Sequence, residues 1–352
     1  MSDPKPFRIA FLGAGGIARS QAEVLKRLPG VQIVAAADPS EAALKKFAEI
    51  VPGVVTYAEP AALFKTQTKL DAVSVCSPNG AHCANTLEAL AAGCHVIVEK
   101  PMALNAAEAE RMIAAADTAK RILSIGFQWR FDNRTRHIRR MIDEGLFGRI
   151  LHVKISAMRR RGIPNWGVFG RKDLQGGGPL IDIGVHVIEM AHFAIGGPRP
   201  LTASASTWTW MGDKPSAVAS MWPNWDHTTY TVEDLAVGQV RLAGGALMTI
   251  ESSFCAHIEK DTWNFQIMGE KAGCTFEPFQ IFSDRDGMMM NMTPGYVGPN
   301  KPGPFDLKLE HFMAVCREGI PNLAPAADGL AVQRILDGLY ASAAQGREIS
   351  IA

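Results

Sequence analysis

The segment from Gly13 to Ala18, which reads Gly-Ala-Gly-Gly-Ile-Ala, constrains the fold of this chain more than any other feature. It follows a short apolar run, Phe7 to Leu12, and leads into a segment rich in helix-forming residues. A second apolar run, Val31 to Ala37, comes next and ends at Asp38. This order of strand, glycine-rich turn, helix and strand is typical of the first unit of a dinucleotide-binding fold.

Each position of this segment has a physical role in such a fold. Gly13 permits the tight turn, Gly15 lets a pyrophosphate approach the backbone, and Ala18 keeps the helix close to the strand. The helix start, at Gly16 and Ile17, offers backbone N–H groups and the positive end of the helix dipole to the phosphates. We therefore expect these residues to bind a cofactor.

Asp38 lies about 20 residues beyond the glycines, which is the spacing of a carboxylate that accepts hydrogen bonds from ribose hydroxyls. A 2′-phosphate there would meet a like charge, and the neighbouring Pro39 and Ser40 supply no arginine to pair with it. The segment therefore predicts NAD rather than NADP. The alternative is a glycine-rich turn that binds no ligand, and the acidic residue at this spacing disfavours it.

Length and composition define the class of protein. A chain of 352 residues is too long for one small core and indicates two domains. Its net charge of +1 lacks the basic excess of a nucleic-acid-binding surface. No apolar run reaches the length of a membrane span, and the first residues contain no export signal. The six cysteines form no Cys-x-x-Cys pair, which predicts free thiols, no metal site and a cytoplasmic location.

The hydrophobic pattern changes near Gly126. Before it, short apolar runs alternate with helical segments, which predicts a parallel sheet with helices on both faces, a Rossmann domain over residues 1–126. After it, the runs 236–242 and 246–254 flank an Ala-Gly-Gly turn and predict an antiparallel hairpin. Residues 127–352 are therefore expected to form an α+β domain with a mostly antiparallel sheet, so the fold class is α/β.

The motif Glu99-Lys100-Pro101 follows the fifth expected strand, His95–Val98. Ligands bind at the carboxyl ends of strands in an open α/β sheet, so Lys100 is well placed for the cofactor and the substrate. A cis bond before Pro101 would fix the direction of the lysine. The alternative is an ordinary solvated loop lysine. Further candidate cofactor contacts follow the fourth strand: Ser77, Pro78, Asn79 and His82, of which the last is equally compatible with a histidine on a helix surface.

Three consecutive glycines, Gly176 to Gly178, precede Asp182 and His186, which stand four residues apart. On a helix these two side chains share one face, and the glycines leave room for a ligand or backbone to come close. A carboxylate beside a histidine supplies a general base and a group that orients the base or the substrate. The alternative makes Asp182 a helix N-cap and His186 a packed core residue.

Aromatic and basic residues gather in three stretches: 128–130, 159–166 and 222–230. Apolar ring faces with fixed hydrogen-bond donors suit a sugar or another polyol. Taken singly, each residue is better explained as an ordinary core aromatic or a solvated basic side chain.

Together these motifs resemble the glucose–fructose oxidoreductase and inositol dehydrogenase family over nearly the whole chain. The most specific parts are the Glu-Lys-Pro motif and the glycine string with Asp182 and His186, and the stretch 230–236 (Tyr-Thr-Val-Glu-Asp-Leu-Ala) is a further match. The resemblance implies a large open sheet in the second domain that supports the active site and the contacts of a homodimer or homotetramer. It also implies Lys100, Asp182 and His186 as the catalytic set.

The resemblance extends to the remaining contacts. The expected cofactor-binding residues are Gly13, Gly15, Gly16, Ile17, Ala18, Asp38, Ser77, Pro78, Asn79, His82, Glu99, Lys100 and Gln128. The expected substrate-binding residues are Lys100, Arg130, Arg159, Trp166, Asp182 and His186.

The expected activity is NAD-dependent oxidation of a secondary alcohol of a sugar or polyol. His186 takes the hydroxyl proton, Asp182 orients His186 or the substrate, and Lys100 donates a hydrogen bond to the reacting oxygen. One alternative is a glycoside hydrolase that keeps NAD bound and oxidises the sugar transiently. Another is a regulatory protein that binds NAD without chemistry, and the presence of all three residues disfavours it.

Overall fold

The computed structural model describes residues 5–220, 222–299 and 301–351. The chain divides into two compact units, Met1–Gln128 with Pro302–Leu330, and Trp129–Lys301 with Ala331–Ala352. Relative to the boundary expected at residue 126, the difference is the return of residues 302–330 to the first unit.

The first unit contains a six-stranded sheet in the order β3-β2-β1-β4-β5-β6, and all its strand pairs are parallel. This is the doubly wound order in which the chain reverses direction between β1 and β4, where dinucleotides bind. The strands are β1 (Phe7–Leu12), β2 (Val31–Ala37), β3 (Val55–Tyr57), β4 (Ala72–Val75), β5 (His95–Val98) and β6 (Leu123–Ile125).

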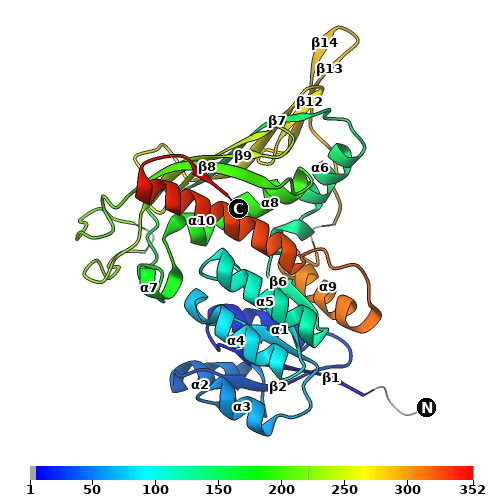
Figure 1. The fold of residues 1–352 in the computed structure, drawn as a ribbon, viewed down its shortest axis with the longest axis vertical. Coiled ribbons are helices and arrows are strands. Elements are labelled where there is room, and N and C mark those ends of the chain that lie inside the picture. Colours follow the sequence, from blue (N-terminus) through cyan, green and yellow to red (C-terminus); the bar gives the residue numbers. More distant parts are fainter. Residues whose placement is uncertain (1–4, 221, 300, 352) are drawn as a thin grey trace. The chain divides into compact units, whose positions relative to one another are not determined.

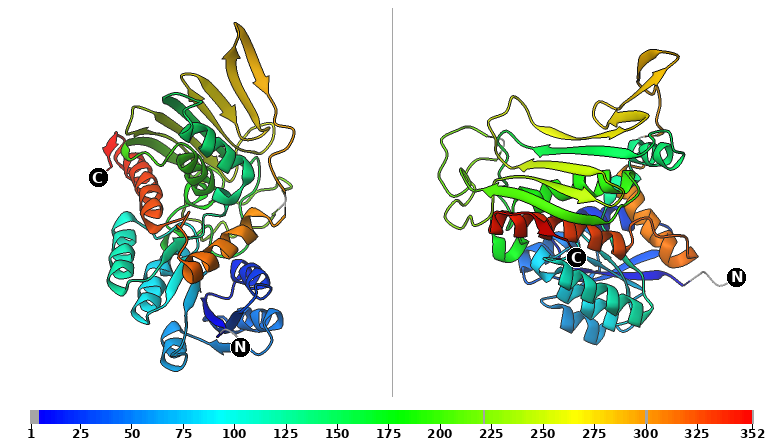
Figure 2. Two further views of the ribbon diagram at one scale, coloured as in Figure 1. Left: turned by 90° about the vertical axis from the view of Figure 1, so that its right-hand side faces the viewer. Right: turned by 45° about the horizontal axis from the view of Figure 1, so that its top comes forward.

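Helices cover both faces of this sheet. Figure 2 shows α4 and α5, in cyan, on the side of the sheet opposite α1 and α2, in dark blue. All four residues of β4 are buried, because helices cover both faces of the sheet. The helices are α1 (Gly16–Leu25), α2 (Glu41–Ile50), α3 (Pro60–Thr66), α4 (Asn79–Ala91), α5 (Ala106–Ala119) and α9 (Pro304–Glu318).

Helix α9 explains why residues 302–330 belong to the first unit. Its residues Leu309, Phe312 and Met313 are buried in the same apolar cluster as Phe11 of β1 and Phe47 of α2. Burying large apolar side chains stabilises by about 1.5–3 kcal/mol each. The position of α9 in the sequence, after the second sheet, gives no hint of this packing.

The second unit contains a nine-stranded sheet in the order β14-β13-β12-β11-β7-β10-β9-β8-β15. All described pairs are antiparallel except β7 with β10, and the expected hairpin is present as β9 and β10. The fold class predicted from the sequence is confirmed. The strands are β7 (Ile150–Met158), β8 (Pro200–Trp208), β9 (Leu235–Leu242), β10 (Leu247–Ser253), β11 (Thr262–Gly269), β12 (Ala272–Thr275), β13 (Gln280–Arg285), β14 (Met288–Met292) and β15 (Ile349–Ser350).

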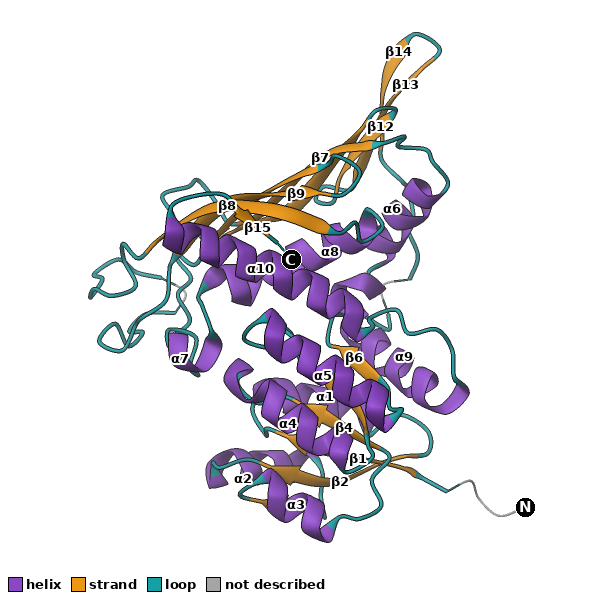
Figure 3. Cartoon of the chain, in the orientation of Figure 1, coloured by secondary structure: helices purple, strands orange, loops and turns teal. Residues whose placement is uncertain are grey.

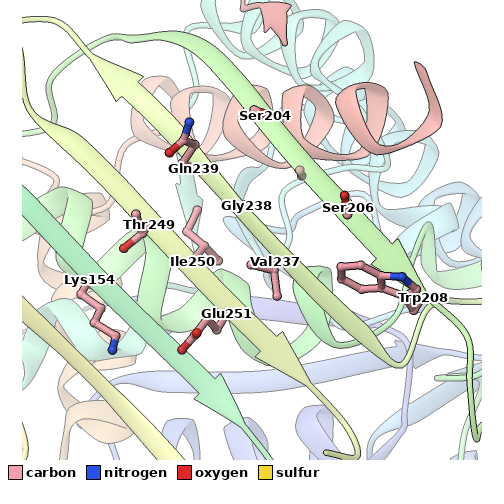
Figure 4. Close-up of a pocket in the computed structure, with 11 residues that line it drawn as sticks. Lys154, Ser204, Ser206, Trp208, Val237, Gly238, Gln239, Thr249, Ile250 and Glu251 are labelled. Atoms are coloured by element: carbon pink, nitrogen blue, oxygen red, sulfur yellow. The ribbon is translucent and has the colours of Figure 1, made fainter. Parts of the chain in front are cut away.

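The two faces of this sheet differ. Helices α6 (Asn133–Asp143), α8 (Val185–Ala194) and α10 (Ala326–Gln345) lie along one face (Figures 1 and 3). The other face is open and carries Lys154, Gln239, Thr249 and Glu251 around a shallow cavity of about 380 Å³ (Figure 4). Such alternation of buried and polar side chains is expected of an antiparallel sheet with one solvated face.

The remaining helical segments are short: a 3₁₀ turn at Gln128–Phe131, α7 (Lys172–Gln175) and a π-helical turn at Leu180–Gly184. Within the part of the chain that the structure describes, no helix is both long and apolar enough to cross a membrane.

Candidate active site

The glycine-rich turn has the geometry of a phosphate-binding loop. Gly13 has a φ of +96°, and a Cβ there would lie 2.6 Å from the carbonyl group of Cys76, so a glycine is required. Gly15 is the N-cap of α1 and supplies no side-chain hydrogen bond to the helix. A Cβ at Gly15 or Gly16 would meet nothing within 4 Å. The turn therefore exposes a helix N-terminus that fits a pyrophosphate.

Asp38, at the end of β2, holds this turn in place. Its Oδ2 accepts a hydrogen bond of 2.8 Å from the backbone N–H of Ala14, and its Oδ1 accepts one of 2.8 Å from Ser40. Each carboxylate oxygen has a second lone pair, so both can also accept a ribose hydroxyl. Asp38 thus supports the glycine turn and can bind the ribose at the same time.

His82 joins the two loops that follow β4 and β5. Its side chain is 1% exposed, so the alternative of a histidine on a helix surface is wrong. One ring nitrogen lies 2.8 Å from the carbonyl oxygen of Pro101, and the other lies 2.9 Å from that of Ser77. Burial lowers the pKa of His82, although the two carbonyl oxygens oppose this effect. The peptide bond between Lys100 and Pro101 is cis, as expected.

Glu99 is the centre of a buried polar network beneath Lys100. Its Oε1 lies 2.6 Å from the ammonium of Lys308 on α9 and accepts a hydrogen bond of 2.7 Å from Gln21 on α1. Gln21 in turn accepts one of 2.6 Å from Ser74 on β4. Burial raises the pKa of Glu99, but Lys308, together with Lys100 and Gln21, outweighs burial and holds the pKa below its ordinary value. The carboxylate therefore stays ionised next to half-buried Lys100.

Asp182 and His186 come from a helical segment that is otherwise buried. Asp182 lies in the π-helical turn Leu180–Gly184, and His186 lies in the first turn of α8. Between residues 177 and 192 every residue except these two is buried. A π-turn inserts one extra residue per turn and is frequent at functional sites. The sequence predicted that Asp182 and His186 share one face of a helix, and it gave no sign of the π-turn.

Glu233 fixes the start of this segment. Its carboxylate accepts hydrogen bonds from the backbone N–H groups of Gly178, at 2.9 Å, and Leu180, at 3.2 Å. It also accepts one of 2.8 Å from the hydroxyl of Tyr340 on α10. A Cβ at Gly177 would collide with the Tyr340 hydroxyl, and one at Gly178 would collide with the Glu233 carbonyl oxygen. The glycines therefore serve close backbone packing in this segment.

Arg159 connects Asp182 with an aromatic cluster. Burial lowers the pKa of Arg159, and the negative charges of Asp182 and Asp261 oppose that effect. The guanidinium carbon lies 4.9 Å from the ring centroid of Trp222, and Trp222 packs edge-on against Trp166. Of the expected substrate-binding residues, Arg159, Trp166, Asp182 and His186 all lie in the second unit.

Arg130 occupies a different environment from the other expected substrate contacts. Its Nε donates to Glu189 of α8 at 2.9 Å, and both side chains are fully buried. Its guanidinium also lies 4.9 Å from the Phe193 ring centroid. With this geometry Arg130 holds α8 against the 3₁₀ turn Gln128–Phe131. Gln128, an expected cofactor contact at the start of that turn, is half-buried.

Sequence reasoning assigned no role to Lys308, Gln21, Glu233 or Tyr340. Glu233 lies in the stretch 230–236 that the family resemblance included, and that match was its signal. The other three are distant in sequence from the residues they contact, by 209, 78 and 107 residues. In the described residues, no group of three or more His, Cys, Asp or Glu side chains is arranged to hold a metal ion.

Comparison with known proteins connects the two units to one family. Residues 7–127 match the family model described as an oxidoreductase family with an NAD-binding Rossmann fold, and residues 135–275 match the GFO/IDH/MocA C-terminal domain. The chain belongs to this oxidoreductase family. NAD is accordingly its cofactor, and the glycine turn and Asp38 have the geometry to hold it.

Individual relatives extend over the full chain. A D-glucoside 3-dehydrogenase from Escherichia coli (strain K12) is 33% identical over 348 residues, which are 98% of this chain and 98% of the relative. An inositol 2-dehydrogenase from Rhizobium meliloti (strain 1021) is 27% identical and covers 98% of this chain and 99% of its own. The crystal structure of an oxidoreductase domain protein from Kribbella flavida shares the fold, with a TM-score of 0.85, 23% identity and coverage of 99% and 100%.

Proposed function

We propose that the protein is a sugar or polyol dehydrogenase that oxidises a secondary alcohol to a ketone with NAD. The observation that carries this proposal is the full-length similarity to a glucoside dehydrogenase, combined with Asp182 and His186 as the two residues that emerge from a buried helical segment. Bound NAD supplies the hydride acceptor for the alcohol carbon.

Three side chains are proposed to act on the alcohol. His186 accepts the proton of the hydroxyl as a general base, and Asp182 orients His186 or a neighbouring hydroxyl. Lys100 donates a hydrogen bond to the same oxygen, where negative charge develops as the proton leaves. The ionised Glu99 behind Lys100 and the Glu233 contacts behind Asp182 support these positions.

The residues proposed to hold NAD surround the carboxyl ends of the parallel strands. They are Gly13 to Ala18 and Asp38 on the first half of the sheet, and Ser77, Pro78, Asn79, His82, Glu99, Lys100 and Gln128 on the second. His82 acts by joining two of these loops. We expect NAD to be preferred over NADP, because a 2′-phosphate would lie against the Asp38 carboxylate.

The assembly and location are proposed on separate observations. The open face of the large sheet carries exposed Trp208 and Val237, which supports a homodimer or homotetramer formed through this sheet. All six cysteines are free, which supports a reducing, cytoplasmic location.

The test is a screen of sugars, glycosides, inositols and sugar acids for stoichiometric NADH formation, with NADP as the comparison cofactor. His186→Ala should lower turnover by about 10²- to 10⁴-fold with NAD binding nearly unchanged. Lys100→Met should lower turnover by at least about 10²-fold with stability little changed. Wild-type turnover in either variant would contradict the assigned roles. Sugar cleavage without NADH release would indicate a glycoside hydrolase that keeps NAD bound. NAD binding without any reaction of the sugars would indicate a regulatory protein.

A further inference from the structure

Three aromatic rings in the second unit form a surface that the mechanism above does not use. Trp166 packs edge-on against Trp222, with centroids 4.7 Å apart at 86°, and against Phe169, with centroids 6.0 Å apart at 74°. Although two rings support it, Trp166 remains 49% exposed. We call these three residues the aromatic platform.

The platform is rigidly tied to the surrounding loops. The side-chain amide of Asn165 donates to the carbonyl oxygen of Pro223 at 2.7 Å, which joins the loop of Trp166 to the loop of Trp222. The backbone N–H of Thr231 donates to Gly170 at 2.8 Å and closes the other end. Because hydrogen bonds fix both loops, Trp166 is held in place before any ligand binds, which lowers the entropy cost of binding.

A cavity of about 220 Å³ opens beside Trp166. It is smaller than the pocket for a drug-sized ligand, so its size suits a single ring. Its lining combines ring faces with Asp226, whose carboxylate is ionised because hydrogen bonds from Thr228 and Thr229 lower its pKa. Ring faces beside a carboxylate acceptor match a ligand with an apolar face and hydroxyl donors.

The platform is connected to the proposed catalytic residues within the same unit. Asp182 interacts electrostatically with Arg159, the guanidinium of Arg159 lies 4.9 Å from the Trp222 centroid, and Trp222 contacts Trp166. A continuous series of contacts therefore leads from Asp182 through Arg159 and Trp222 to Trp166.

We propose that the aromatic platform is a subsite for a second ring of the substrate, the sugar or aryl group of a glycoside, beyond the ring that is oxidised. This inference rests on the proposed dehydrogenase function and specifies its substrate as a glycoside rather than a free monosaccharide. Stacking of the second ring on Trp166 provides the added affinity, and Arg159 separates the two subsites.

The experiment compares three probes with the full-length protein and NAD: methyl glucoside, an aryl glucoside and a glucose disaccharide. In Trp166→Ala, kcat/KM for the probes with a second ring should fall about tenfold, whereas that for methyl glucoside should change little. Trp166→Phe should recover part of the loss. The matched control is Tyr296→Ala, because Tyr296 is an aromatic residue of the same unit that is 77% exposed and lies outside the platform, and it should leave the ratio between probes unchanged.

The outcomes separate this inference from the proposed function. An equal loss for all three probes in Trp166→Ala, or no loss for any, overturns the subsite. A loss for the aryl probe alone or for the disaccharide alone identifies which second ring it takes. Calorimetric binding to the NADH-loaded protein provides a readout without turnover. If the second-ring probes bind no tighter than methyl glucoside there, the subsite is overturned, and if they bind without being oxidised, the proposed function fails instead.

Discussion

Glu99 in the first unit and Glu233 in the second are equally buried carboxylates with opposite acid–base behaviour. They are 7% and 8% exposed, and each contacts a segment that carries a proposed catalytic residue. Yet the pKa of Glu99 lies below its ordinary value, and that of Glu233 lies above it.

The difference comes from the charge of the partners rather than from burial. Burial raises the pKa of both groups. At Glu99 the ammonium of Lys308, 2.6 Å away, acts with Lys100 and Gln21 to reverse that effect. At Glu233 the donors are two backbone N–H groups and the Tyr340 hydroxyl, which are neutral and offset burial only in part. Neutral donors satisfy a buried carboxylate without forcing it to ionise.

The two units therefore support their proposed catalytic residues by different devices. In the first unit an ion pair keeps an ionised carboxylate next to Lys100. In the second unit, hydrogen bonds from neutral donors to Glu233 fix the backbone before Asp182, and we call this arrangement the clamp. The comparison predicts that the stabilising effect of the Glu99–Lys308 ion pair depends on charge. The stabilising effect of the hydrogen bonds to Glu233 should depend on their geometry.

The largest effect on stability is expected when the ammonium of Lys308, the ion-pair partner of Glu99, is removed. Lys308→Met keeps the apolar stem but leaves a buried carboxylate without its cation, which should destabilise the first unit by about 3–5 kcal/mol. The control is Lys26→Met, because Lys26 forms a surface pair with Glu23, in which the side chains are 39% and 49% exposed. It should cost less than about 1 kcal/mol.

Thermal and urea unfolding of both variants measure this difference. The double variant Lys308→Met/Glu99→Gln removes both charges and should recover most of the lost stability. Equal stability of Lys308→Met and Lys26→Met would mean that the buried ion pair does not stabilise the fold.

The second effect comes from removing the clamp. Glu233→Ala leaves the N–H groups of Gly178 and Leu180 without their acceptor, which should destabilise by about 1–3 kcal/mol. The backbone before Asp182 then loses its anchor, and a misplacement of about 1 Å costs on the order of 10²-fold in turnover. NAD affinity should stay unchanged, because its proposed contacts lie in the other unit.

Steady-state kinetics and NAD titration of Glu233→Ala test this expectation. The control is Glu259→Ala, which removes an exposed carboxylate from the same unit. If Glu233→Ala lowers stability but leaves kcat unchanged, the clamp is structural and does not position Asp182.

The same two regions show how far the sequence predicts the structure. The βαβ unit was predictable because its elements are consecutive and its glycines and Asp38 have fixed spacing. Strands β1, β2 and β5 have the predicted bounds. Asp182 and His186 were predicted as candidates because both lie within one short string. The βαβ unit and the string with Asp182 and His186 are both formed by residues close together in the sequence, so their spacing predicts their local geometry.

The supporting contacts were not predictable, because they join residues far apart in the chain. Lys308 and Tyr340 look like an ordinary exposed lysine and a core tyrosine of two C-terminal helices. Their roles depend on α9 packing on the first sheet and on α10 packing on the second. The π-turn at Asp182 was missed for another reason, since its pattern of apolar residues is indistinguishable from that of an α-helix.

A smaller effect is expected when only one donor of the clamp is lost. Tyr340→Phe keeps the ring but removes the hydroxyl that donates to Glu233, while Gly178 and Leu180 still donate. The loss of one hydrogen bond should cost about 0.5–1.5 kcal/mol, less than Glu233→Ala. A double-mutant cycle with Glu233→Ala measures the coupling. Additive effects of the two changes would show that the hydroxyl and the carboxylate do not act together.

The last effect distinguishes the two carboxylates most directly, through its dependence on pH. Glu233→Gln keeps one acceptor oxygen, but the amide nitrogen that replaces the other oxygen cannot accept, so at neutral pH the variant should lose about 0.5–1.5 kcal/mol of stability, the cost of one hydrogen bond. The difference should depend on pH. Because the folded-state pKa of Glu233 is raised, its contribution to stability is fully present below the unfolded value of about 4.3 and is lost as the pH rises through the folded value. Relative to the glutamine variant, the wild type should therefore lose stability between about pH 4.3 and neutrality.

For Glu99→Gln the sign reverses. The folded-state pKa of Glu99 is lowered, so its contribution is present above about pH 4.3 and is lost as the pH falls through the folded value. Melting temperatures of the wild type and both glutamine variants from acid to neutral pH measure the two differences. If both variants deviate from the wild type over the same pH range and in the same direction, then burial rather than the charge of the partner governs these carboxylates, and the contrast between Lys308 and Tyr340 does not explain their behaviour.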